Sequence, residues 1–157
     1  VKKHPDIKLL WAGEGKFREE AESMVKRLSL RGRVIFLGHR GQRDLPAIYN
    51  LADLFIFPSR RDEGLPLVLL EALACGVPVI ASSIAPVREV IEEEVNGYTY
   101  DSGNIEMLQQ KIEQYFSSVT LQKKMKEEAR KKAEAVFTMK KMGEETERVL
   151  KSLIRKG

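Results

Sequence analysis

Short apolar runs alternate with stretches of helical periodicity along the first two thirds of the chain. Four runs, at residues 7–13, 33–38, 54–59 and 78–82, have the length and content of buried β-strands. Between them the pattern favours helices, one of which starts at Asp44 as its N-cap and another of which runs from about 66 to 75 and ends at Gly76. This alternation predicts an α/β fold with a Rossmann-like parallel sheet and helices on both faces.

The remaining elements are shorter or purely helical. A short helix is expected around 87–91, and a turn at Asn96-Gly97 leads to a small strand at 98–100. From about residue 104 apolar positions recur only at helical spacing and form three stripes: Ile105, Leu108, Ile112 and Phe116; Leu121, Met125, Ala129 and Ala133; Met142, Thr146, Val149 and Leu153. Because no flexible linker precedes this helical tail, we expect a single domain over 1–157, with the tail at about 104–157.

Composition narrows the classes of function. The chain has 157 residues and is 43% hydrophobic, enough to bury a core, and no apolar run approaches the roughly 20 residues that span a membrane. The net charge of +4 arises mainly after residue 120, where acidic and basic residues interleave. This pattern favours a solvated helix face, with peripheral contact to an anionic membrane or to another domain as the alternative. Because no basic stripe with interleaved aromatic residues is present, we expect no nucleic-acid partner.

Cysteine and histidine usage argues against disulfides and metals. Cys75 is the only cysteine, which excludes a disulfide within the chain and suits a reducing, cytoplasmic compartment. His4 and His39 lie far apart and have no cysteine partners. We therefore expect no metal site.

A single carboxylate, Glu71, interrupts an otherwise apolar helical segment. Helix side chains lean toward the helix N-terminus, so Glu71 should point toward the carboxyl edge of the sheet, where doubly wound sheets bind ligands. A buried carboxylate without a partner is strongly unfavourable. Its partner is either a protein group, such as Arg88 or backbone amides, or the vicinal hydroxyls of a ligand such as a ribose.

A second carboxylate, Glu63, lies on the loop ahead of this helix, directly before Gly64. Glycine lets the backbone approach a ligand closely, and the first amides of a helix are free donors that can hold a phosphate. Taken alone, Glu63 is equally an acid that the helix dipole favours. Together with Glu71, it matches the order of groups in a nucleoside diphosphate sugar: sugar, diphosphate, ribose.

Glu63 and Glu71 have the E-x7-E spacing of retaining glycosyltransferases of the GT-B fold, family 4. Over most of residues 5–100 the chain resembles the C-terminal, nucleotide-sugar-binding domain of that family. The matching segments are LLWAGEGKFREEAE, RVIFLG, LADLFIFPS and LLEALACGVPVIAS, in the family's order. The resemblance implies half of a GT-B fold, and transfer of a hexose from a nucleoside diphosphate (NDP) sugar with retained configuration. It also implies no cofactor and no required metal.

The resemblance further implies roles for individual residues. Glu63 would be the catalytic-site acid that contacts and orients the donor sugar, and Glu71 would hold the ribose. Sugar and diphosphate would face the amides of Gly64, Leu65, Leu67 and Val68. The cleft would be lined by Gly13 and Gly15, which alternatively only shape a strand end. The base would be bordered by Gly38, His39 and Arg40, with His39 alternatively an exposed loop residue.

The chain also departs from the family. Where the usual loop reads E-G-F-G-L-P, this one reads EGLPLV, so Leu65 replaces an aromatic residue and Pro66, which has no N–H, replaces a glycine. Counterparts of the N-terminal acceptor-binding domain and of the first strand of the C-terminal domain are absent. We therefore expect the chain alone to be catalytically inactive, and the full-length enzyme to be cytoplasmic, with membrane association as an alternative.

The missing strand lies at the centre of the family's sheet, between the strands at 7–12 and 54–57. Unpaired buried amides are costly. Three outcomes are open: those two strands pair directly, a second copy supplies a strand in a strand-swapped homodimer, or the domain is only marginally stable.

Three other functions compete with this interpretation. One is a catalytically silent binding or scaffold module, and another is a sugar-nucleotide epimerase on the same fold. The third is a dinucleotide-binding dehydrogenase domain, suggested by the segment GEGKFR. Against the third, Arg18 stands where the last glycine of G-x-G-x-x-G is expected, and no acid for a ribose follows the second strand.

Overall fold

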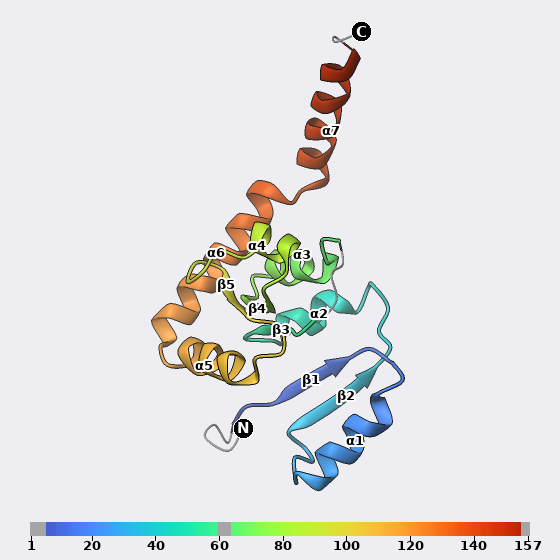
Figure 1. Cartoon of the computed structure of the whole chain (residues 1–157), viewed down its shortest axis with the longest axis vertical. Helices are drawn as coiled ribbons and strands as arrows, with labels where there is room; N and C mark the ends of the chain where they lie inside the picture. The colour runs from blue at the N-terminus through green and yellow to red at the C-terminus, as the bar shows by residue number, and fades with distance from the viewer. Residues whose placement is uncertain (1–5, 60–63, 155–157) are drawn as a thin grey trace. The chain divides into compact units, whose positions relative to one another are not determined.

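The computed structural model describes residues 6–59 and 64–154, which divide into two compact units, residues 1–45 (unit 1) and 46–157 (unit 2). In chain order the elements are β1 (Leu9–Ala12), α1 (Arg18–Arg27), β2 (Val34–Gly38), α2 (Leu45–Asn50), β3 (Phe55–Phe57), α3 (Leu67–Ala74), β4 (Val79–Ser82), α4 (Ala85–Val90), β5 (Gly97–Tyr100), α5 (Ile105–Phe116), α6 (Val119–Val136) and α7 (Met139–Ile154) (Figure 1). Each unit is described by itself. The prediction of one domain stays a prediction.

Unit 1 is a β–α–β arrangement. β1 and β2 run parallel, with Leu9 opposite Val34 and Leu10 opposite Ile35, and α1 connects them. The strands were expected to be buried on both faces, but Leu9 and Trp11 are 44% and 43% exposed. The reason is that a two-stranded sheet with a single helix has only one face covered within the unit.

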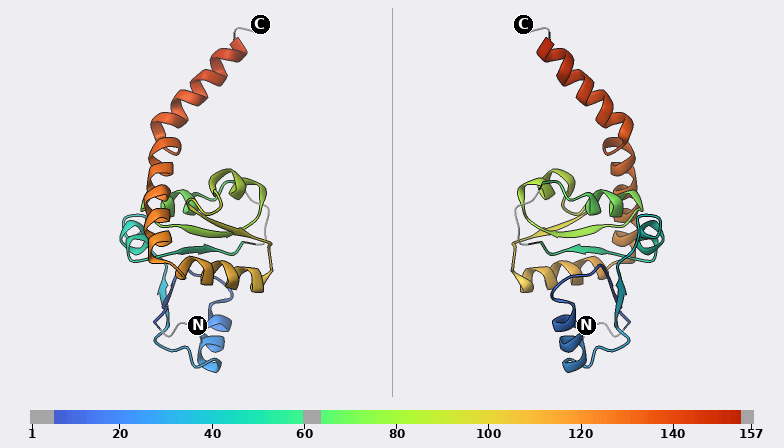
Figure 2. Two further views of the ribbon diagram at one scale, coloured as in Figure 1. Left: turned by 90° about the vertical axis from the view of Figure 1, so that its left-hand side faces the viewer. Right: turned by 90° about the vertical axis from the view of Figure 1, so that its right-hand side faces the viewer.

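Unit 2 contains a three-stranded parallel sheet in the order β3–β4–β5. β4 lies at its centre, and all four of its residues are buried. Helices α3 and α4 lie on one face of this sheet and α5 lies on the other (Figure 2). The predicted α/β class, with parallel strands flanked by helices, is therefore confirmed.

The sequence suggested one sheet, and each unit contains its own set of paired parallel strands. The described residues form two sheets, β1–β2 and β3–β4–β5. Since β1 belongs to unit 1 and β3 to unit 2, direct pairing of these two strands stays a prediction. A strand from a second copy and a marginally stable domain both stay predictions.

The core of unit 2 lies between the sheet and α5 and α6. It is built on Ile80, Tyr98, Tyr100, Tyr115 and Met125, each at most 4% exposed. The hydroxyl of Tyr115 donates to the backbone oxygen of Asp53 at 2.6 Å. This bond gives a buried polar atom its partner and ties α5 to the turn before β3.

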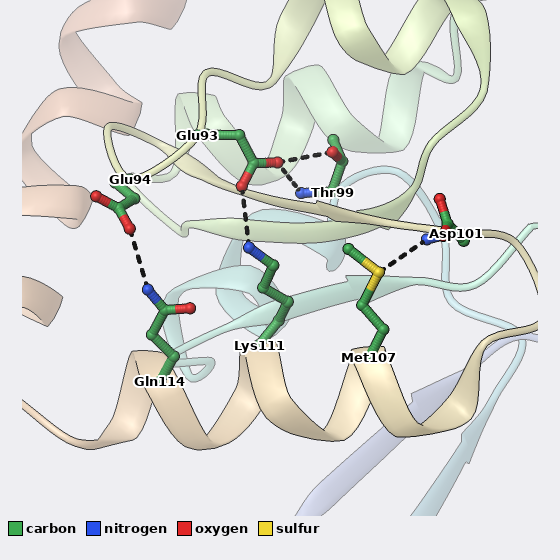
Figure 3. Close-up of polar contacts among 7 residues, drawn as sticks. All are labelled: Glu93, Glu94, Thr99, Asp101, Met107, Lys111 and Gln114. Atoms are coloured by element: carbon green, nitrogen blue, oxygen red, sulfur yellow. Dashed lines mark hydrogen bonds and ion pairs between the residues drawn. The ribbon is translucent and has the colours of Figure 1, made fainter.

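A polar network fastens the loop before β5 to α5 (Figure 3). The carboxylate of Glu93 accepts hydrogen bonds from the backbone N–H of Thr99 at 2.5 Å and from its hydroxyl at 2.6 Å. It also pairs with Lys111 of α5 at 3.3 Å. Gln114, one turn further along α5, donates to Glu94 at 3.1 Å. The loop is thus held at two successive turns of the helix.

The last two helices differ in how they pack. α6 buries Met125, Ala129 and Ala133, as its apolar stripe predicted. In α7, Val149 and Leu153 of the predicted stripe are 55% and 63% exposed, and no described residue of this helix is buried. Within the described residues, no helix combines the length and apolar character that crossing a membrane requires.

Candidate functional site

The first backbone N–H groups of α3 have no described hydrogen-bond acceptor. The helix begins after Pro66, whose backbone is extended, and no side chain accepts a hydrogen bond at this cap. The N–H groups of Leu67 and Val68 have no acceptor inside the helix, because the first amides of an α-helix lie ahead of any partner carbonyl. Leu65 and Leu67 are 40% and 68% exposed. These amides carry the positive end of the helix dipole, which favours an anion.

The opposite end of α3 is closed. Gly76 has φ +70°, which favours glycine, and its N–H donates to the oxygen of Leu73 at 2.9 Å. The N–H of Val77 donates to the oxygen of Ala72, also at 2.9 Å. The guanidinium of Arg130, from α6, donates to the oxygen of Ala74. The contrast between the two ends makes the N-terminus of α3 the candidate binding end.

Packing against α6 fixes the orientation of α3. The buried face of α3 consists of Leu69, Ala72 and Leu73, and α3 contacts α6, which buries Met125 and two alanines. Small residues allow two helices to approach closely. With that face used for packing, Glu71 is only partly buried.

Tyr49 of α2 is the protein partner of Glu71. Its hydroxyl donates to Oε2 of Glu71 at 3.0 Å. Arg88, considered from the sequence as a partner of Glu71, instead donates through Nε to the hydroxyl of Ser83 at 2.8 Å. Among the described residues, no cation pairs with Glu71, and its Oε1 has no hydrogen-bond donor. Within the described part of the chain, one carboxylate oxygen of Glu71 is thus held by Tyr49 and the other has no partner.

Burial and the neighbouring carboxylate both keep Tyr49 protonated. Desolvation raises the pKa of the Tyr49 hydroxyl, and the hydrogen bond to Glu71 raises it further. Burial likewise raises the pKa of the nearby Cys75 thiol. Tyr49 is therefore a hydrogen-bond donor at neutral pH, and Cys75 lacks the lowered pKa of a reactive thiol.

In unit 1 the predicted residues gather where the two strands end. The N–H of Gly13 donates to the oxygen of Gly38 at 2.8 Å, and both glycines have positive φ, +119° and +72°. Between Gly13 and Gly15, Glu14 pairs with Arg18 at 2.8 Å. A hollow of about 560 Å³ between α1 and β2 contains none of the predicted site residues.

The structure places the other predicted site residues as follows. His39, Arg40, Gly15 and Gly64 are exposed, and Val68 is half-buried. Glu63 lies outside the described residues, so its predicted role stays a prediction. Within the described part of the chain, no group of three or more His, Cys, Asp or Glu residues is arranged to hold a metal ion.

Sequence reasoning missed Tyr49. A tyrosine inside a short helical segment signals a buried hydroxyl that needs an acceptor. The sequence does not say which acceptor, because Glu71 lies on another helix.

Comparisons with known proteins identify the family of the chain. Residues 1–132 match the family described as glycosyl transferases group 1. Spore coat protein SA of Bacillus subtilis (strain 168) is 30% identical over 151 residues, which is 92% of this chain and 40% of that protein. N-acetyl-alpha-D-glucosaminyl L-malate synthase of Bacillus anthracis is 31% identical over 150 residues, covering 96% of this chain and 39% of that protein. The chain thus spans about 40% of the length of these relatives.

Solved structures show the same fold. Alr3699/HepE of Anabaena, in complex with UDP, aligns with a TM-score of 0.87 and 26% identity over 95% of this chain and 42% of that one. The same protein with UDP-glucose gives a TM-score of 0.84. The C-terminal domain of the glycosyl transferase group 1 family protein LpcC of Francisella tularensis gives 0.80, with 26% identity over 88% of this chain and 73% of that one.

Proposed function

The chain belongs to the glycosyl transferases of group 1, and we propose that it is the nucleotide-sugar-binding half of a retaining, family 4 enzyme of the GT-B fold. In the full-length enzyme, a hexose would pass from an NDP-sugar to an acceptor held by an N-terminal domain. Solved relatives with UDP or UDP-glucose support a uridine nucleotide as the first ligand to test.

The proposal assigns the parts of the donor to the parts of α3. The free amides of Leu67 and Val68 would hold the diphosphate, and the carboxylate of Glu71 would accept hydrogen bonds from the ribose hydroxyls. The observation that carries this proposal is the state of Glu71. In the described part of the chain it pairs with no cation and only its Oε2 is engaged, by Tyr49.

The other site residues predicted from the sequence keep their proposed roles. Glu63 would orient the donor sugar, and the leaving diphosphate would be stabilised by amides. The roles of Gly13, Gly15, Gly38, His39 and Arg40 toward the cleft and the base also stay predictions. So do the absence of a required metal, the cytoplasmic location and the inactivity of this chain alone.

Calorimetric titration of the chain with UDP tests the proposal. We expect binding with a dissociation constant of about 1 mM or tighter. Glu71→Ala should weaken it by about tenfold, the effect of losing a hydrogen bond to a charged group. Titrations with GDP and ADP show whether the base is discriminated.

Glu106→Ala is the matched control, because it removes an exposed acid from α5, on the opposite face of the sheet from α3 (Figure 2). Binding should be unchanged in this variant. If none of the three nucleotides bound, the proposal would fail, and the chain would instead be the silent scaffold module considered from the sequence.

A further inference from the structure

The hydroxyl of Tyr49 reaches across from α2 to the first two turns of α3. It lies 3.0 Å from Oε2 of Glu71 and 3.4 Å from the backbone oxygen of Val68. Tyr49 is only 8% exposed, and its hydroxyl is paired with these two acceptors. A single phenol thus contacts both the carboxylate and the helix turn that carries the free amides.

The ring of Tyr49 is held in place by its neighbours. It packs edge-on against Phe55, the first residue of β3, with the ring centres 5.6 Å apart and the planes at 73°. The backbone oxygen of Tyr49 accepts a hydrogen bond from the N–H of Ala52 at 2.9 Å, which closes the end of α2. The position of the hydroxyl is therefore set by the strand and by the helix turn as well as by Glu71.

The hydroxyl proton has one favourable acceptor. An ionised carboxylate accepts more strongly than a backbone carbonyl, and the 3.0 Å contact is the shorter of the two. The hydroxyl of Tyr49 therefore keeps its proton and directs it toward Oε2 of Glu71, which accepts the hydrogen bond. A carboxylate held through one oxygen loses rotational freedom about its last torsion, so the direction of the other oxygen is set as well.

We propose that Tyr49 is a positioning residue, which holds Glu71 through Oε2 so that Oε1 is preset for the ribose hydroxyls of the nucleotide. This inference rests on the proposed role of Glu71. According to this inference, Tyr49 of α2 contributes to the affinity for the ribose without contacting the ligand. Pre-organisation of this kind lowers the entropy lost when the ligand binds.

The test compares UDP with its dideoxy analogue, which lacks both ribose hydroxyls. Tyr49→Phe removes one oxygen atom and keeps the ring against Phe55. In the chain as it stands, this variant should bind UDP about three- to tenfold more weakly and bind the dideoxy analogue as tightly as the wild type does. If Tyr49 had a purely structural role, Tyr49→Phe would weaken the binding of both ligands equally.

Tyr115→Phe is the matched control, since it deletes another buried hydroxyl, one that donates to Asp53 and not to Glu71. It should leave the ratio of the two affinities at the wild-type value, and its folding shows whether the unit tolerates such a deletion. In the double variant with Glu71→Ala, Tyr49→Phe should cause no further loss of UDP affinity.

The outcomes separate the two proposals. If UDP bound and Glu71→Ala weakened it, but Tyr49→Phe left both affinities unchanged or lowered them equally, the positioning role would be overturned and the proposed function would stand. If UDP did not bind the wild-type chain, both would be overturned.

Discussion

At Gly97, strand β5 passes so close to β4 that there is no room for a side chain. A Cβ atom there would lie 2.0 Å from the backbone oxygen of Val79. The clash is with backbone at the buried centre of the sheet, so the neighbour cannot move aside. Just before it, the side chain of Asn96 accepts from the N–H of Glu92 at 2.8 Å and donates to the oxygen of Val90 at 3.0 Å.

Gly97→Ala should therefore lower the free energy of unfolding by about 3 kcal/mol or more, the range of changes that force a buried backbone apart. Gly143→Ala is the control, because nothing lies within 4 Å of the added carbon and alanine favours the helix there. Urea denaturation followed by circular dichroism measures both. A Gly97→Ala variant as stable as the wild type would contradict the close approach of the strands.

For single residues, the sequence predicts the element in which a residue lies better than the contacts that the residue makes. The pair Asn96-Gly97 was expected as a turn that leads to a strand. Asn96 does end a turn there, and Gly97 is the first residue of β5, where it passes close to Val79 of β4. The position of Glu71 in a helix was predicted correctly, but Tyr49 was not, because its contact depends on how two helices pack. Local patterns do not contain the distance between residues on different elements.

Among the elements, α3 and β5 show what local signals do and do not determine. The bounds of α3 were predicted closely because Pro66 and Gly76 mark its two ends. The division of the strands into two sheets was not, because pairing depends on contacts between strands far apart in the chain. β5 lies at an edge of its sheet, where the carboxylate of Glu93 accepts a hydrogen bond from the backbone N–H of Thr99 (Figure 3). Edge amides left free invite pairing with another chain.

Glu93→Ala should lower the free energy of unfolding by about 1–3 kcal/mol, since it removes an acceptor that serves two donors of Thr99 and one of Lys111. Glu94→Ala, which loses only a contact with Gln114, should cost less than about 1 kcal/mol. Thermal unfolding of both variants, with light scattering to detect association, checks this. Equal stability of the two variants would mean that the Glu93 network contributes little.

In the whole molecule, the described buried residues are concentrated in unit 2. Every described buried residue lies at or after Tyr49, and no described residue before it is buried. Of the four buried tyrosines, three have a raised pKa, first of all because of burial: Tyr49, Tyr98 and Tyr115. In the folded protein these phenols thus stay protonated at a pH at which they lose their protons in the unfolded chain.

This difference predicts a loss of stability in alkali. The unfolded tyrosines ionise near their ordinary pKa of 10.0, and the folded ones ionise higher. Their contribution is therefore complete below pH 10 and declines as the pH rises through the folded pKa values. We expect the urea midpoint to fall steadily above pH 10, with phenolate absorbance appearing together with unfolding. Phenolate formation in the folded protein near pH 10 would contradict the burial of these hydroxyls.

The packing of α3 on α6 has a consequence for the order in which the protein is made. The helix that carries Glu71 leaves the ribosome well before the alanines and Arg130 that hold it in place. Until α6 emerges, α3 lacks one wall and the cap at its C-terminal end. A nascent or prematurely terminated chain would thus contain every residue of the E-x7-E segment and still lack the packing that fixes the orientation of α3.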